Sequence, residues 1–359
     1  MLGTLSTVAG PGRSRLAYAT TGSGRYDLLL VPDGLLPVSS LAGFPPYAAF
    51  LERLANLGRL IVFDRRGLGE SSWDWTMGHP GLADWADDAR RVLDAARSPR
   101  AVVIGLAEGA MTAITFATAY PNRVAALVLV NATPGPSLSA VARRGVGPGY
   151  IGFLRSTLTG GWAKDLPGMD ILAPSLGRDP TFSVWFHQAI RRIGDPTRFA
   201  PVFDAALRGE VRGDLRSLGA PTLVIHRRDD AWFAPDHGRL IARAIPRARY
   251  LELPGADHVP YLGETGPIFA AIRSFLDEML VLEGGRRADD DPSPLTARQA
   301  EILELVGRGL SDKEVARATG LSVRTVQKHL EDTYRRLGVA NRMSAVVQYR
   351  ARRRPARRA

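Results

Sequence analysis

Residues 101–130, AVVIGLAEGAMTAITFATAYPNRVAALVLV, constrain the fold of this chain most strongly. Two short apolar runs, AVVIGL and VAALVLV, contribute strands, and a helical segment lies between them. Apolar runs of this length without polar alternation are typical of parallel strands that are buried on both faces. The order strand, sharp turn, helix, strand therefore predicts a βαβ unit.

The same alternation continues through residues 1–283. Further short apolar runs predict strands that begin at Tyr26, Arg59, Pro221 and Arg247. Apolar residues three and four apart, the pattern of amphipathic helices, occur in residues 46–58, 82–97 and 236–246. We therefore expect an open, doubly wound, mostly parallel α/β sheet, which binds ligands at the carboxyl ends of its strands.

Two segments interrupt the pattern. Residues 135–220 are too long for an ordinary connection, and an insertion of this kind is usually a lid over a site. Its aromatic residues are expected mainly to pack the lid's own core, with one or two free to line a pocket. Residues 284–293 are polar and contain glycine and proline, so they predict a linker between two domains.

The turn after the strand at residue 101 reads Gly105-Leu106-Ala107-Glu108-Gly109. With serine at position 107 it would be the G-x-S-x-G turn that presents the nucleophile of a hydrolase. Asp230 and His258 each follow a later strand, which is the order of acid and base in such enzymes. A methyl group cannot attack a substrate, so this arrangement lacks its nucleophile.

Residues 1–283 resemble the α/β-hydrolase superfamily over their full length. The stretches FDRRGLGESS, HRRDD and PGADHVPYLG are similar to a subgroup found fused to bacterial nucleotide cyclases and transcription regulators. That subgroup normally has G-x-S-E-G at the turn, so Glu108 fits and Ala107 departs. The resemblance implies an acid role for Asp230 and a base role for His258, with no bearer of the nucleophile role.

We therefore predict a pseudo-hydrolase with no catalytic residue and a pocket for a small ligand. The loop at residues 33–35 and the backbone N–H of Glu108 could hold a carbonyl or carboxylate oxygen. The predicted ligand-binding residues are Asp33, Gly34, Leu35, Ala107, Glu108, Asp230, Trp232 and His258.

Other interpretations remain open. Asp230 and His258 could activate water or take a proton from a substrate without a covalent step, as in an active hydrolase or lyase. The domain could instead serve only in dimerisation. An engineered replacement of serine by alanine at position 107 is a further alternative.

The C-terminal segment, residues 294–350, predicts four short helices. Thr296, Ser311 and Ser322 precede helical patterns as N-caps, and Glu314 completes a capping box with Ser311. Glycines at 309, 320 and 338 end the first three helices. Two short helices joined by a turn that contains Gly320 indicate a helix-turn-helix.

This segment resembles the LuxR/GerE-type DNA-binding domain. Four motifs stand in register with that family: Leu295-Thr296-x-Arg298, Gly309-Leu310-Ser311-x-Lys313-Glu314-Val315-Ala316, Thr325-Val326-x-x-His329 and Leu337-Gly338-Val339-x-Asn341-Arg342. The resemblance implies binding to double-stranded promoter DNA, as a homodimer on two half-sites. The whole chain is then an α/β-hydrolase-like domain with a helical lid plus a small all-α domain.

The third helix of this segment is the expected recognition helix. Val326 and Leu330 should pack inward, while Arg324, Gln327, Lys328 and Glu331 should face outward. Gln327 can pair with adenine, and Arg324 or Lys328 with guanine or phosphate, although the family usually has lysine at the position of Gln327. Phosphate contacts are expected from Lys313, Thr325, His329 and Arg342. The predicted DNA-binding residues are Ser311, Lys313, Ser322, Arg324, Thr325, Gln327, Lys328, His329 and Arg342.

Charge is unevenly distributed along the chain. The net charge is +11, and residues from 284 onward contribute 17 Arg and Lys against 9 Asp and Glu. This asymmetry favours a polyanion partner for the C-terminal module. The basic tail, residues 351–359, could add salt-sensitive affinity for DNA or be a solvated end of the chain.

The remaining composition narrows the class of protein. The chain has no cysteine, which excludes disulfides and thiolate metal sites. There is no apolar run that would span a bilayer and no signal-peptide pattern. We expect a cytoplasmic transcription regulator with no cofactor and no metal, whose hydrolase-like domain senses a small ligand or mediates dimerisation.

Overall fold

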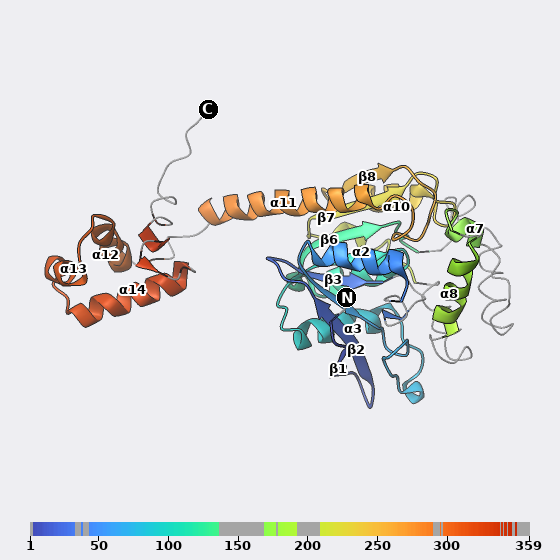
Figure 1. Cartoon of the computed structure of the whole chain (residues 1–359), viewed down its shortest axis with the longest axis horizontal. Helices are drawn as coiled ribbons and strands as arrows, with labels where there is room; N and C mark the ends of the chain where they lie inside the picture. The colour runs from blue at the N-terminus through green and yellow to red at the C-terminus, as the bar shows by residue number, and fades with distance from the viewer. Residues whose placement is uncertain are drawn as a thin grey trace. The chain divides into compact units, whose positions relative to one another are not determined.

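The computed structural model describes residues 3–32, 37–38, 43–135, 169–176, 179–191, 209–289, 295, 297–337, 339, 341–342, 344–346 and 349. The chain divides into two compact units, residues 1–275 and 276–359 (Figure 1). The first unit is an α/β sheet domain and the second is helical. Within the described residues, there is no helix with the length and apolar character needed to cross a membrane.

The first unit is built on a sheet of eight strands in the order β1-β2-β4-β3-β5-β6-β7-β8. The strands are β1 (Ser6–Ala9), β2 (Arg15–Thr21), β3 (Asp27–Val31), β4 (Arg59–Phe63), β5 (Ala101–Leu106), β6 (Val124–Val130), β7 (Thr222–Arg227) and β8 (Arg249–Leu253). In the described sheet, the pairs among β3 to β8 are parallel, and β1 and β2 add antiparallel pairs. The prediction of a mostly parallel sheet is confirmed.

Helices cover the sheet because its strands are apolar on both faces. The helices of this unit include α2 (Pro45–Ala55), α3 (Leu82–Ala95), α4 (Gly109–Ala119), α10 (Pro235–Ala244) and the first part of α11 (Gly266–Asp289), whose later residues belong to the second unit. Side chains of α3, α4 and α10 share one buried core with Leu29 and Val31 of β3. Leu28 and Leu30 point to the opposite face and are also fully buried.

Part of the predicted lid is described. It contains α7 (Met169–Leu172) and α8 (Pro180–Arg191), while residues 136–168, 177–178 and 192–208 lie outside the described residues.

Helix α11 continues through Asp289, and so enters the range 284–293 that was predicted as a linker. A helix tolerates an internal glycine at a cost of about 1 kcal/mol relative to alanine, so Gly284 and Gly285 do not end it.

The second unit contains α12 (Ala297–Gly307), α13 (Asp312–Thr319) and α14 (Val323–Leu337) around a small apolar core. Helix α12 was predicted to end at Gly309 but ends two residues earlier, at Gly307; Gly309 follows with φ of +91°. The turn after α13 passes through Gly320 with φ of +68°, a left-handed conformation that favours glycine. Thr296 and Gly338 lie outside the described residues. The predicted helix-turn-helix is confirmed as α13, turn and α14.

Side-chain hydrogen bonds begin α13 and α14 at the predicted residues Ser311 and Ser322. The backbone N–H of Thr325 donates to Ser322 Oγ over 3.1 Å at the start of α14. The backbone N–H of Ser311 donates to Glu314 Oε2 over 2.7 Å at the start of α13. Asn341 Oδ1 accepts from the backbone N–H of Ser344 over 2.9 Å, and Ala345 is fully buried beyond it. These bonds satisfy N–H groups that a helix leaves unpaired at its start.

Candidate functional site

Ala107 stands in the turn between β5 and α4 with φ of +47°. This left-handed conformation typically costs a non-glycine residue about 1–3 kcal/mol. The backbone N–H of Ala107 donates to Val130 O over 2.9 Å, and the residue is almost fully buried. The turn therefore keeps the strained backbone of a nucleophile-presenting turn although its side chain is a methyl group.

The flanking glycines are required by close packing. A Cβ atom on Gly105 would lie 2.7 Å from Ala110 Cα. A Cβ atom on Gly109 would lie 2.2 Å from Pro32 O. Glycine at these positions thus lets α4 begin against the end of β3. The predicted ligand residues that follow β3, Asp33, Gly34 and Leu35, lie outside the described residues.

Asp230 and His258 are brought together at the carboxyl ends of the adjacent strands β7 and β8. His258 Nδ1 lies 2.8 Å from Asp230 Oδ2, and both residues are buried. The other oxygen of Asp230 accepts from the backbone N–H groups of Trp232 and Phe233, over 2.9 and 3.1 Å. Trp232 lies with its ring centroid 6.0 Å from that of His258.

A second histidine, which the sequence analysis missed, shares the same carboxylate. His226 Nε2 is 3.6 Å from Asp230 Oδ2 and 2.8 Å from Phe233 O. Because a carbonyl oxygen can only accept, this nitrogen carries a proton. Burial alone would raise the pKa of Asp230, but the charge of His258 and hydrogen bonds from His226 and His258 hold it well below its usual range. Asp230 is therefore ionised at neutral pH.

The predicted lid contacts the loop that carries His258. The backbone N–H of His258 donates to Leu172 O over 2.9 Å, and that of Ser175 donates to Asp257 Oδ1 over 2.9 Å. From the sheet side, Asn131 Nδ2 donates to His258 O over 2.7 Å. The position of the histidine loop is thus coupled to Leu172 at the end of α7 and to Ser175 just after it.

Aromatic rings anchor α8 to the sheet domain. Phe44, just before α2, stacks on Trp185 with ring centroids 4.1 Å apart and lies 5.5 Å from Phe182. Phe44 also contacts Tyr261, three residues after His258, at 6.5 Å. The expectation that lid aromatics pack mainly among themselves is therefore incomplete, because Phe182 and Trp185 also pack on residues outside the lid.

Another buried histidine lies near this site. His237 Nδ1 is 2.9 Å from Thr133 Oγ1, and its ring stacks on Phe233. Burial, helped by the charges of His226 and Arg212, lowers the pKa of His237 to about 4.

Among the residues that the structure describes, no group of three or more His, Asp or Glu side chains is arranged to hold a metal ion.

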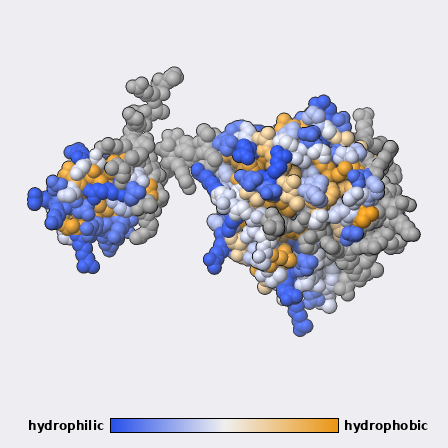
Figure 2. All heavy atoms as spheres, viewed as in Figure 1, coloured by the Kyte–Doolittle hydropathy of each residue, from blue (hydrophilic) through white to orange (hydrophobic). Residues whose placement is uncertain are grey.

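Several candidate residues of the second unit lie on the surface of α14. Val326 and Leu330 are buried, while Arg324, Gln327, Lys328 and Glu331 are exposed, as the spacing predicts. Hydrophilic residues predominate on the visible face of this unit (Figure 2). Thr325 and His329 are half-buried, and Lys313 on α13 is exposed.

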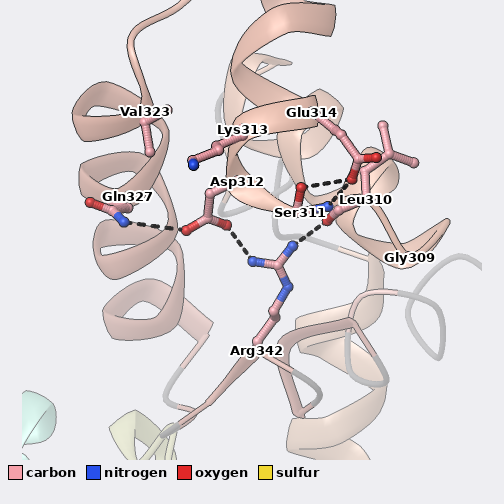
Figure 3. Close-up of a pocket in the computed structure, with 9 residues that line it drawn as sticks. All are labelled: Gly309, Leu310, Ser311, Asp312, Lys313, Glu314, Val323, Gln327 and Arg342. Carbon is pink, nitrogen blue, oxygen red and sulfur yellow. Dashed lines mark hydrogen bonds and ion pairs between the residues drawn. The ribbon is translucent and has the colours of Figure 1, made fainter.

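Arg342 makes contacts inside the domain. Its guanidinium donates to Asp312 Oδ1 and to Leu310 O, next to a surface hollow of about 630 Å³ (Figure 3). Ser311 and Ser322 are engaged in their caps. The predicted phosphate contact of Arg342 would have to be made by donors that these two bonds leave available.

Each of the two units matches a known protein family. Residues 28–272 match the model of the alpha/beta hydrolase family. The chain belongs to the alpha/beta hydrolase family. Residues 293–349 match the bacterial regulatory proteins of the luxR family, so the second unit is a LuxR-type helix-turn-helix domain. We refer to residues 1–275 as the hydrolase unit and to residues 276–359 as the LuxR unit.

Individual relatives match one unit or the other. The hydrolase unit is 27% identical to the pimeloyl-[acyl-carrier protein] methyl ester esterase of Stenotrophomonas maltophilia, over 67% of this chain and 91% of that protein. A crystal structure of a hydrolase from Pseudomonas aeruginosa superposes with a TM-score of 0.61 at 27% identity, covering 76% of this chain and 98% of that one. The "Putative HTH-type transcriptional regulator YhjB" of Escherichia coli is 42% identical over 21% of this chain. The chain spans 41% of the length of YhjB and less than half of some other curated relatives.

Proposed function

We propose that this protein is a DNA-binding transcription regulator whose hydrolase unit is catalytically inactive and binds a small ligand. A LuxR-type domain joined to a hydrolase fold supports the regulator. The observation that carries the finer proposal is the turn at Ala107, which keeps φ of +47° without a nucleophile. Strain of this kind persists only where the surrounding structure maintains it, which favours a retained site.

The retained acid and base support binding without turnover. Asp230 and His258 keep their 2.8 Å contact, so the acid–base pair of a hydrolase site remains. Without the attacking hydroxyl, a triad enzyme keeps only the catalysis that its oxyanion site and substrate binding provide. A sensor needs this property, because it must release its signal unchanged.

Ligand binding can reach the rest of the molecule through the lid. The bonds from His258 to Leu172 and from Ser175 to Asp257 join the lid to the histidine loop, and α11 begins at Gly266 soon after that loop. A ligand that favours one lid position would shift the population of histidine-loop conformations. We propose that this shift alters how a homodimer in the cytoplasm presents its two DNA-binding heads.

Ester turnover tests the inactive site. The full chain should hydrolyse p-nitrophenyl esters no faster than its His258→Ala variant. Ala107→Ser should raise turnover by roughly a hundredfold or more, because it returns a nucleophile to a positioned base. The double variant Ala107→Ser, His258→Ala is the control, and it should lose that gain.

A second experiment tests sensing. The protein is purified from its host, extracted, and any bound small molecule is identified by mass spectrometry. The identified compound should change the affinity of the full chain for its DNA by about fivefold or more. Failure to find a compound, together with unchanged DNA binding across a metabolite panel, would leave the hydrolase unit with a dimerisation role only.

The rival candidate is an enzyme without a covalent step. It is favoured by the esterase relative, which matches over 91% of its length, and by the ionised Asp230 beside His258. Such an enzyme would use His258 to activate water. Turnover by the unaltered chain that His258→Ala abolishes would decide for this candidate.

A further inference from the structure

The hollow in the LuxR unit is lined by a chain of polar contacts that links three separate elements (Figure 3). Asp312 is the first residue of α13, Gln327 lies on α14, and Arg342 lies in the segment after α14. Arg342 Nη1 donates to Asp312 Oδ1, and Gln327 Nε2 donates to Asp312 Oδ2 over 3.4 Å. The two oxygens of one carboxylate thus serve two different partners.

Arg342 fixes the carboxylate. Its second terminal nitrogen donates to Leu310 O in the turn before α13, so the guanidinium is held at two points. The side chains of Arg342 and Asp312 are 39% and 27% exposed, which leaves the pair partly shielded from solvent. Arg342 also offsets the negative charge of Asp312, which would otherwise repel a DNA backbone that approached α14.

The carboxylate in turn orients the exposed amide of Gln327. Only the nitrogen of an amide can donate to a carboxylate, so Nε2 faces Asp312 and Oε1 points away from it (Figure 3). The bond is long, but its acceptor is charged, and a free glutamine would lose up to about 2 kcal/mol of side-chain entropy on ordering. An amide held in advance loses less of that entropy when DNA binds.

We propose that Asp312 and Arg342 are positioning residues that set the base preference of Gln327. This inference rests on the proposed DNA-binding function. With its oxygen outward, Gln327 accepts a hydrogen bond from a base that carries an amino group at its major-groove edge, which is adenine or cytosine. Guanine and thymine offer only acceptors there, so they can pair only with the second N–H of Gln327, which leaves its oxygen unpaired and disfavours them.

Selection from a random pool of double-stranded DNA tests the proposal on the full chain. The unaltered protein should enrich a sequence, and Gln327→Ala should erase the preference at one base position of it. At that position the unaltered protein should prefer adenine or cytosine. The isosteric Asp312→Asn can offer either a donor or an acceptor to the amide of Gln327, so it no longer fixes the amide in one orientation. The frequency of guanine at that position should therefore rise by roughly five- to tenfold relative to the preferred base.

Two further variants separate positioning from folding. Arg342→Met should weaken the base preference at the same position. The double variant Asp312→Asn, Gln327→Ala should show the same base preferences as Gln327→Ala alone. Glu331→Ala is the matched control, because Glu331 is also exposed on α14 and does not line the hollow; it should leave this base position unchanged. Thermal unfolding of each variant shows whether it is folded.

The outcomes are distinct. An unaltered chain that enriches no sequence would refute the regulator proposal and this inference together. An enriched sequence with the same base preference in Asp312→Asn would refute the inference alone. A guanine or thymine preference at the Gln327 position would also refute it.

Discussion

In the hydrolase unit, Ala107, Asp230 and His258 are only 1–3% exposed, whereas in the LuxR unit the outward face of α14 is open to solvent. A buried site must be maintained by the packing around it, so substitutions near it affect folding and function together. A surface that reads DNA can change its side chains with little effect on the core below. The two units should therefore respond differently to comparable substitutions.

The largest difference between the responses of the two units is expected from a substitution in the buried ion pair of the hydrolase unit. Arg66 and Asp88 are 2% and 0% exposed, and Arg66 Nε donates to Asp88 Oδ1 over 2.7 Å. Asp88→Ala should destabilise this unit by about 3–5 kcal/mol, because it leaves a buried guanidinium without its main counter-ion. Calorimetry should show a lower transition for the hydrolase unit and an unchanged one for the LuxR unit. A loss below about 1 kcal/mol would contradict the prediction.

Acid should act mainly on the hydrolase unit, through two opposed groups. His237 has its pKa lowered to about 4, so the unfolded chain gains a proton between pH 6.5 and 4 that the folded chain does not, and stability falls as pH falls. Burial, against hydrogen bonds from the backbone of Val38 and Glu70, raises the pKa of Asp64 to about 6. Folded Asp64 takes up a proton first, so this group favours the folded state as pH falls.

Variants separate these two contributions. Relative to the unaltered chain, His237→Gln should gain roughly 2–3 kcal/mol in unfolding free energy between pH 6.5 and 4. Asp64→Asn should lose unfolding free energy relative to the unaltered chain over the same pH range. Urea unfolding at a series of pH values measures both, and parallel curves for either variant and the unaltered chain would contradict its assignment.

A methyl group on glycine probes packing in one unit and backbone strain in the other. Gly109→Ala places Cβ 2.2 Å from Pro32 O and should cost about 1–3 kcal/mol through overpacking. Gly320→Ala meets no atom within 4 Å but has φ of +68°, so it should cost about 1–2 kcal/mol through strain alone. Chemical unfolding of both variants, with domain-specific fluorescence or NMR signals, compares them. Equal destabilisation of both units by Gly109→Ala would show that they do not unfold separately.

Sequence reasoning was most successful where chain order determines position. Asp230 and His258 follow neighbouring parallel strands, so their meeting at one sheet edge could be anticipated from the βαβ pattern. The helix-turn-helix could be anticipated because caps, glycines and apolar spacing all agree over residues 311–338.

It was less successful where contacts are set by packing between distant segments. His226 lies within an apolar strand, and its spacing of four residues from Asp230 gives little indication that it shares the carboxylate. Arg342 turns toward Asp312, 30 residues away in sequence, although a basic residue in a DNA-binding domain first suggests a phosphate. The strands β1 and β2 were missed because neither contains a long apolar run: β1 has four residues and is mostly exposed, and β2 combines the buried Leu16, Ala17 and Ala19 with half-buried threonines.

The smallest expected effect is at the N-cap of the recognition helix. Ser322 Oγ accepts from the backbone N–H of Thr325, so Ser322→Ala should destabilise the LuxR unit by about 1 kcal/mol and leave the hydrolase unit unchanged. Ser322→Asp is the matched control, since aspartate also caps a helix and should recover most of the loss. Aspartate also brings a negative charge to the end of α14 that we propose faces DNA, so the affinity of Ser322→Asp for DNA should fall further below that of the unaltered chain as salt is lowered. Recovery of stability without that loss of affinity would place the start of α14 away from the DNA backbone.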